Sequence, residues 1–323
     1  MRDHDVRMAP KRRHDAAMLA GRHVRRRMLG PLHNQRVAPL ALARYYEHAY
    51  YFYCYLSLLN FPDTTTESSL DLLMQDFLEY MWDNNAGLQA AQSVVAGVCH
   101  LLRHAVRLRG SWRLLGVWRR AEPPARAPPL PQRVALALAM HALRQGDPAF
   151  CVSVLIGFYA YLRTAEIINL CVAHCHTDRR KNLILSLGMS KSGKRRGEAE
   201  YAIIKAGPVA TLIGIFLAAR QGQARICECE EWVWRARFDR YLSELGLSQL
   251  GWRPYSLRRG GATHAFVEGL SMSQVCVRGR WAHESTARLY IQEAVSLLQQ
   301  MAIPAAALQT VQWLSDLWNF DLS

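Results

Sequence analysis

A proline-rich segment near the middle of the chain most constrains how the chain can fold. Five prolines fall within nine positions, 123–131, of the 323-residue sequence. Proline lacks a backbone N–H and has a fixed φ, so such a run can neither continue a helix nor pair within a central strand. It is typical of a stiff, extended linker. We therefore predict a linker at residues 122–131 that joins a domain at 36–121 to a domain at 132–323.

The charge of the chain favours an acidic partner. The sequence holds 40 Lys and Arg against 26 acidic residues, a net charge of +14. The first forty residues carry ten Lys and Arg against three Asp, a net charge of +7, so half of the excess lies on the folded body. Such an excess indicates nucleic acid first and an anionic membrane surface second. We expect residues 1–35 to be a basic disordered arm, compatible with DNA contact or nuclear import.

Two other classes are disfavoured: membrane-spanning proteins, and proteins stabilised by disulfides or zinc. No run of about 18 or more uncharged apolar residues occurs, so we expect no membrane span. The eight cysteines are scattered, and without a secretion signal we expect reduced thiols. The sets Cys171, Cys175, His176 and Cys227, Cys229 lack the paired C-x-x-C spacing of a zinc knuckle. Because Cys171 also lies in an apolar helical pattern, we expect buried thiols and no metal site.

The domain at 36–121 is predicted to be helical, because its apolar residues recur at steps of three and four. Helices are expected over 40–59, 70–83, 88–107 and 113–119, the second with a capping box of Ser68 and Asp71. The first carries a stripe of six tyrosines: Tyr45, Tyr46, Tyr50, Tyr51, Tyr53 and Tyr55. We interpret this stripe as core and helix-packing surface, and not as a base-stacking platform.

The domain at 132–323 mixes helices with a small sheet. Helices are predicted over 132–144 and 149–161. Strands at 183–187 and 201–204 flank a lysine- and glycine-rich turn, and helices follow from 206 onward apart from turns at 246–254. The fold class is therefore mainly α with a small antiparallel β-sheet. The apolar tail after residue 295 could pack on its own domain or dock on a neighbouring protomer.

Four segments of this domain carry polar residues that suggest chemistry. They are 161–170 with Arg163 and Glu166, the turn at 191–197 with Lys191 and Lys194, 254–264 with Tyr255 and Arg258, and 279–290 with Trp281 and Tyr290. Each alone is a weak signal. An isolated Arg–Glu pair is usually a surface ion pair, a lysine-rich turn is usually a solvated loop, and a single tryptophan or tyrosine usually belongs to a core.

In this order, the segments resemble the boxes of the tyrosine recombinase (phage-integrase) family, which shares its catalytic domain with type IB topoisomerases. Arg163 and Glu166 match the R-x-x-E box. Leu257 and Arg258 match the H-x-L-R box. Tyr290 follows Trp281 by nine residues, as the family's nucleophile follows its His or Trp. The resemblance covers about residues 135–295. The version of the boxes in this sequence is similar to that in recombinases of eukaryotic mobile elements.

Two positions depart from the family pattern. Tyr255 stands where histidine is usual, and Arg280 separates Gly279 from Trp281. A tyrosine with a pKa of about 10 is a poor base near neutral pH, although its hydroxyl can still hydrogen-bond a phosphate. We therefore expect a working enzyme that is slower than its relatives.

The resemblance implies a helical core-binding domain followed by a catalytic domain, and it implies a role for each residue. Arg163 and Arg258 would clamp the scissile phosphate, because guanidinium groups can pair with both non-bridging oxygens. Glu166 would orient Arg163, and Trp281 would donate its indole N–H to the phosphate. Lys191, with Lys194 as the alternative, would be the general acid. Tyr290 would attack phosphorus and form a 3′-phosphotyrosyl bond.

The same resemblance implies the partners. Double-stranded DNA would be the substrate, and a homotetramer would assemble on two DNA sites. Because the protein–DNA ester conserves bond energy, no cofactor, metal or ATP would be needed. The protein would act in the nucleus of a eukaryote, or otherwise in the cytoplasm with DNA. Two alternatives stay open: DNA relaxation like that of a type IB topoisomerase, and a domesticated DNA-binding protein that no longer cuts, which Tyr255 favours.

Overall fold

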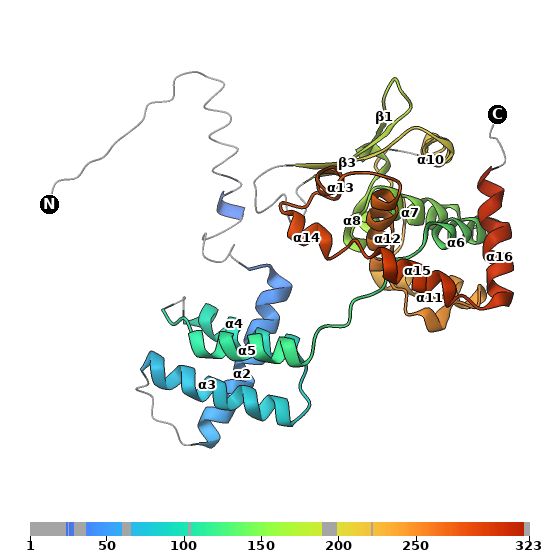
Figure 1. Cartoon of the computed structure of the whole chain (residues 1–323). Coiled ribbons are helices and arrows are strands. Elements are labelled where there is room, and N and C mark those ends of the chain that lie inside the picture. Colours follow the sequence, from blue (N-terminus) through green and yellow to red (C-terminus); the bar gives the residue numbers. More distant parts are fainter. Residues whose placement is uncertain are drawn as a thin grey trace. The chain divides into compact units, whose positions relative to one another are not determined.

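The computed structural model describes residues 24, 26–28, 37–59, 66–102, 105–188, 199–220 and 222–319. The chain divides into two compact units, and the division falls between Ala125 and Arg126, inside the proline-rich segment (Figure 1). Each unit has its own hydrophobic core. The basic arm expected at 1–35 lies almost wholly outside the described residues.

The first unit is built from the helices α2 (Pro39–Leu58), α3 (Glu67–Asp83), α4 (Leu88–Leu101) and α5 (Arg109–Ala121). Its core contains Phe52, Met74, Phe77 and Val95. Helix α4 packs closely on α2 at Gly97, where an added Cβ would lie 2.6 Å from the Tyr45 carbonyl oxygen. The predicted helical character of this unit is confirmed, although α4 ends at Leu101 and not at residue 107.

The capping box predicted at Ser68 and Asp71 is wrong. Helix α3 begins at Glu67, and its N-cap is Thr66, whose hydroxyl accepts the Ser69 N–H at 3.2 Å. Asp71 instead accepts the backbone N–H groups of Gly110 and Ser111, at 2.7 and 2.9 Å. Its carboxylate therefore caps the start of α5, a contact between residues too far apart in the chain for local spacing to show.

The interpretation of the tyrosine stripe as core is also wrong for most of its members. The side chains that are clearly exposed are Tyr46 (56%), Tyr50 (66%), Tyr51 (54%) and Tyr53 (39%). Helix α2 buries only Ala49 and Phe52 completely. Adjacent tyrosines cover more of the helix circumference than one core-facing stripe, which follows steps of three and four residues.

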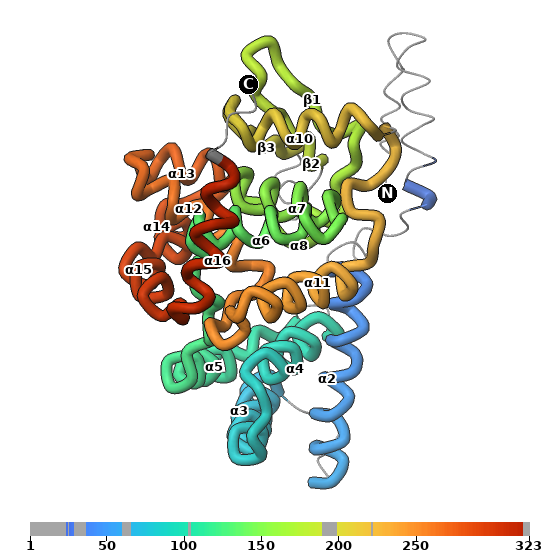
Figure 2. The backbone as a smooth tube through the Cα atoms, turned by 90° about the vertical axis from the view of Figure 1, so that its right-hand side faces the viewer, coloured from blue at the N-terminus to red at the C-terminus, as the bar shows by residue number. Residues whose placement is uncertain are grey.

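The second unit surrounds one apolar helix, α7 (Pro148–Tyr159), in which every residue from Phe150 to Phe158 is buried. It packs against α6 (Gln132–Arg144), α8 (Thr164–Asn169), α10 (Pro208–Ala218) and α12 (Pro254–Val267). Within the described residues of this unit, the other helices are α11 (Glu231–Glu244), α13 (Met272–Gly279), α14 (Glu284–Arg288), α15 (Glu293–Met301) and α16 (Ala305–Asp316), with short 3-10 turns at Val172–His174, Ser248–Leu250 and Leu317–Asn319. Figure 2 shows these helices around α7 from a second side.

The sheet of this unit is antiparallel in the order β1 (Cys175–Thr177), β2 (Leu183–Gly188), β3 (Glu200–Ile204). The two longer strands are confirmed, with Leu185 opposite Ala202. Burial alternates along β3, so Glu200, Ala202 and Ile204 face inward. Lys191 and Lys194 fall in 189–198, outside the described residues.

Two adjacent glycines allow α12 to approach its neighbours closely. A Cβ at Gly260 would lie 2.0 Å from the Leu130 carbonyl oxygen, and one at Gly261 would lie 1.9 Å from that of Phe158. Leu130 is fully buried, and its N–H donates to the Ser256 carbonyl at 3.1 Å. The end of the proline-rich segment therefore packs on the second unit, against the helix that carries Tyr255 and Arg258.

The tail packs on its own domain through α16, which lies against α6. Val311 and Leu314 are buried, and the Trp318 indole N–H donates to the Leu136 carbonyl at 3.0 Å. Helix α15, in contrast, buries no residue and exposes Leu297, Leu298 and Met301.

The cysteines are all free thiols. Cys171 is not helical as predicted: it is extended and bridges to Arg225. Cys171, Cys175 and Cys229 are only half-buried, so the expectation of buried thiols holds for Cys227 alone among these four. Burial raises the pKa of Cys175 and of Cys227 to about 12.

Candidate active site

Arg163 and Glu166 lie at the start of α8 and are joined by two hydrogen bonds. Arg163 is the N-cap residue, and its guanidinium donates to Glu166 Oε1. The other carboxylate oxygen, Oε2, accepts the Arg163 backbone N–H at 2.9 Å. The Arg163 side chain is 27% exposed, whereas that of Glu166 is only 9% exposed. Glu166 therefore fixes both the backbone and the guanidinium of a residue that still reaches the surface.

Arg258 lies in the interior, one turn after Tyr255 on α12. Its side chain is fully buried. One terminal nitrogen donates to the Tyr161 carbonyl and the other to the Gly279 carbonyl, the latter at 2.7 Å. Burial lowers the pKa of Arg258 to about 10, and the charges of Arg280 and Arg163 act in the same direction. The guanidinium still carries its charge near neutral pH.

Tyr290 follows α14 and is tied to α12 through its backbone. Its carbonyl accepts the Thr263 hydroxyl at 3.1 Å, and the preceding carbonyl, that of Leu289, accepts Arg259 Nη2 at 2.9 Å. The Trp281 ring packs on the Tyr290 ring with 4.5 Å between centroids. The Arg258 guanidinium carbon lies 4.8 Å from the Trp281 ring centre and 5.5 Å from that of Tyr290.

The hydroxyl groups of Tyr255 and Tyr290 are hydrogen-bonded to each other. Burial, together with the interaction with Tyr290, raises the pKa of Tyr255 well above its usual range. Burial also raises the pKa of Tyr290, but hydrogen bonds from Tyr255 and Trp281 and the charges of Arg258 and Arg163 outweigh it, so that the pKa falls below the usual value. These shifts fit Tyr255 as the donor and the Tyr290 oxygen as the acceptor.

Six of the predicted residues thus lie in one place: Arg163, Glu166, Tyr255, Arg258, Trp281 and Tyr290. Lys191 and Lys194 are outside the part of the chain that the structure describes. The deprotonated form of the Tyr290 oxygen is stabilised, and several guanidinium groups lie nearby. This arrangement is suited to nucleophilic attack on an anionic ester.

Sequence reasoning missed two arginines of this region. Arg280, which looked like a spacer between Gly279 and Trp281, is buried, and its Nη2 donates to Glu166 Oε2 at 2.7 Å. Arg259 is also buried and holds the residue before Tyr290. A signal for Arg280 was present: Glu200 takes an inward-facing position in the alternation of β3, and a buried carboxylate needs a cation.

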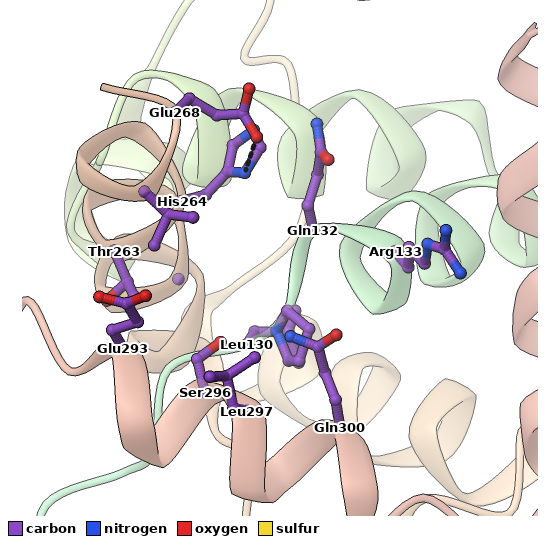
Figure 3. Close-up of a pocket in the computed structure, with 13 residues that line it drawn as sticks. Leu130, Gln132, Arg133, Thr263, His264, Glu268, Glu293, Ser296, Leu297 and Gln300 are labelled. Atoms are coloured by element: carbon purple, nitrogen blue, oxygen red, sulfur yellow. Dashed lines mark ion pairs between the residues drawn. The ribbon is translucent and has the colours of Figure 1, made fainter. Parts of the chain in front are cut away.

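A separate hollow lies between α6, α12 and α15 (Figure 3). His264 and Glu268 face each other there, with 3.9 Å between Nδ1 and Oε1. Thr263 lines this hollow and also contacts the Tyr290 backbone, so the hollow lies on the backbone side of Tyr290. Burial lowers the pKa of His264. The phenol and guanidinium groups described above do not line it.

No group of three or more His, Cys, Asp or Glu side chains among the described residues could hold a metal ion. Among the same residues no single helix has the length and hydropathy to cross a membrane, and only the bent pair Glu284–Met301 and Ala305–Asp316 meets those criteria jointly.

Comparison with known proteins gives matches at the level of structure. No protein-family profile matches the sequence, and neither does any curated protein. The Tn1549 transposon integrase in complex with transposon right end DNA is 11% identical, with a TM-score of 0.54 over 88% of this chain and 98% of that chain. The XerH site-specific recombinase bound to difH substrate is 12% identical, with a TM-score of 0.51 over 76% of this chain and 72% of that chain. The chain therefore has the fold of tyrosine recombinases, which confirms the predicted fold class.

Proposed function

We propose that this protein is a site-specific DNA recombinase or integrase that cuts and rejoins double-stranded DNA through a covalent bond to Tyr290. One observation carries the proposal. The Tyr290 hydroxyl is hydrogen-bonded to Tyr255 beside the guanidinium of Arg258, although Tyr290 follows α14 and the other two residues lie on α12. The fold shared with the XerH recombinase and the Tn1549 integrase supports the same conclusion.

The reaction follows from the chemistry of the groups present. The Tyr290 oxygen attacks phosphorus, the bond from phosphorus to the 5′-oxygen breaks, and a 3′-phosphotyrosyl ester and a 5′-hydroxyl form. Attack by a 5′-hydroxyl reverses the step and rejoins the strand. The ester conserves the bond energy, so the exchange needs neither ATP nor a metal ion. Lys191 or Lys194 would protonate the departing 5′-oxygen.

The two arginines have different surroundings and therefore different parts in the clamp. Arg163 is partly exposed and fixed by Glu166, so it can turn donors towards a phosphate that approaches from solvent. Arg258 is buried, with two donors on backbone carbonyls. Its charge lies against the Tyr290 and Trp281 rings on their buried side. The low dielectric there strengthens its effect on the negative charge that develops at the phosphate.

Tyr255 assists the nucleophile by donating a hydrogen bond. A donor to the Tyr290 oxygen stabilises its deprotonated form. Tyr255 is 39% exposed, so the phenol pair reaches the surface and the Tyr290 proton can leave to water. This role differs from that of the histidine expected at this position, which would accept the proton.

Recognition of DNA would use exposed basic residues of the first unit. Helix α5 exposes Arg109, Arg113 and Arg120, spaced by four and seven residues, on one helical face. Such a row can contact successive phosphates of a duplex. A tetramer assembled on two DNA sites is part of the proposal, as in the family that the sequence resembles.

The experiment is a trapping assay with a pool of sequence-randomised duplexes, each nicked so that the short fragment carrying the new 5′-hydroxyl diffuses away after cleavage. The wild-type protein should form a DNA adduct that survives denaturing electrophoresis, and Tyr290→Phe should form none. Recovered sequences then provide paired sites for a strand-exchange assay. Exchange between sites supports a recombinase, and relaxation of supercoils without exchange supports a topoisomerase. Binding of DNA without any adduct supports a protein that no longer cuts.

A further inference from the structure

Arg280 combines two unfavourable features at one position. It is the C-cap residue of α13 in the left-handed backbone conformation, with φ of 58°, a region that favours glycine. Its side chain is also only 5% exposed, although a buried cation loses its hydration. A glycine here would avoid both costs, so specific contacts of the guanidinium must offset them.

Those contacts join three other parts of the second unit. Nη2 donates to Glu166 Oε2 at 2.7 Å, at the start of α8. Nη1 donates to the Ala160 carbonyl at 3.3 Å, in the turn after α7. Nε lies 3.5 Å from Glu200 Oε2, at the first residue of β3. One side chain therefore holds together a helix start, a turn and a strand end.

The groups that Arg280 contacts are also the groups that anchor the proposed clamp. Glu166 receives hydrogen bonds from both Arg163 and Arg280. The Tyr161 carbonyl receives hydrogen bonds from both Arg258 and Arg280, the latter at 3.4 Å. The next residue along the chain is Trp281, whose ring packs on Tyr290. Arg280 therefore contacts the groups that hold Arg163 and Arg258, and it precedes Trp281, which packs on Tyr290. Its side chain is buried, so DNA cannot reach it.

We propose that Arg280 is a positioning residue, which holds Glu166 and the Tyr161 carbonyl so that Arg163 and Arg258 act on one phosphate. This inference rests on the proposed function. Lysine cannot replace the arginine, because a single ammonium cannot pair with two carboxylates and two carbonyls in a fixed plane.

The test compares variants on two trapping substrates. One carries an ordinary scissile phosphate, and the other carries a neutral methylphosphonate, which removes the negative charge that the clamp offsets. The variants are Arg280→Lys and the double variant Arg280→Met with Glu200→Gln, which removes the charge of the carboxylate that Arg280 Nε faces. The control is Arg235→Lys on α11, whose Nε donates to Glu231 at 2.9 Å on the surface.

On the phosphate substrate, Arg280→Lys should form the adduct about 10- to 100-fold more slowly, the range expected for a misplaced catalytic group. On the methylphosphonate the deficit should shrink to about threefold or less, with DNA affinity also within about threefold of the wild type. Arg235→Lys should match the wild type on both substrates. The double variant should repeat the pattern of Arg280→Lys.

Equal rates for Arg280→Lys and the wild type on the phosphate substrate would overturn the inference. A deficit of the same size on both substrates would also overturn it, because the residue would then support the fold without acting through the clamp. A wild-type protein that forms no adduct with either substrate contradicts the proposed function instead, and the inference fails with it.

Discussion

The hydroxyl groups of Tyr255 and Tyr290 are hydrogen-bonded to each other, so the residue at the position where the resembled family has histidine contacts the proposed nucleophile directly. Replacing Tyr255 by phenylalanine removes this hydrogen bond and leaves the ring. The pKa of Tyr290, now held below its usual value, should then rise, so less phenolate is present near neutral pH. We expect cleavage about fivefold slower, as for loss of about 1 kcal/mol of hydrogen bonding.

The pH dependence checks this explanation. A raised Tyr290 pKa moves the rising limb of the cleavage rate to higher pH, so Tyr255→Phe should recover most of its rate in alkaline buffer. Tyr159→Phe is the matched control, because Tyr159 accepts a hydrogen bond from Gln132 at 3.0 Å outside the active site.

Tyr255→His should hold or raise the cleavage rate, since histidine can accept the proton. A large loss in Tyr255→His would show that this position is not the family's histidine position.

The two clamp arginines should respond differently to lysine. Arg163→Lys should slow cleavage about 100-fold, the cost of losing one preorganised donor, with little change in thermal stability because the side chain is partly exposed. Arg258→Lys should slow cleavage and also lower the melting temperature, since it removes hydrogen bonds from a fully buried cation. Thermal unfolding beside the adduct assay measures both. Equal melting temperatures for the two variants would contradict the burial that distinguishes them.

The general acid can be assigned by changing the leaving group. A substrate with sulfur in place of the bridging 5′-oxygen releases a thiolate, which needs no proton. We expect Lys191→Ala to cleave ordinary DNA at least about 100-fold more slowly, and to approach the wild-type rate on the sulfur substrate. If Lys194→Ala shows this rescue and Lys191→Ala does not, the acid is Lys194.

The close packing of α12 gives a prediction about stability. Gly261→Ala should destabilise the second unit by about 2 kcal/mol or more, because its Cβ would lie 1.9 Å from a backbone oxygen. Gly214→Ala on α10 has no atom within 4 Å of its added Cβ, and should stabilise by about 0.5–1 kcal/mol. Denaturant unfolding measures both. A neutral Gly261→Ala would contradict the contact with Phe158.

The sequence predicted the elements whose signals are local. The helical pattern of residues 132–144 and the short apolar run at 183–187 each indicated the element that the structure has. Strand β1 was missed because three residues, Cys175–Thr177, are too few to show alternation. The cap formed by Asp71 and the burial of Arg280 were missed because their partners lie far away in the chain. The exposed tyrosines of α2 were misjudged because composition does not say which face of a helix is covered.

The most direct test of the central claim is the identity of the residue that becomes linked to DNA. The trapped adduct is digested with nuclease and protease, and the peptide that carries the remaining nucleotide is sequenced by mass spectrometry. We predict a single modified residue, Tyr290, and no adduct in Tyr290→Phe. A nucleotide on Tyr255 or on any other residue, or an adduct of full yield in Tyr290→Phe, would contradict the proposed mechanism.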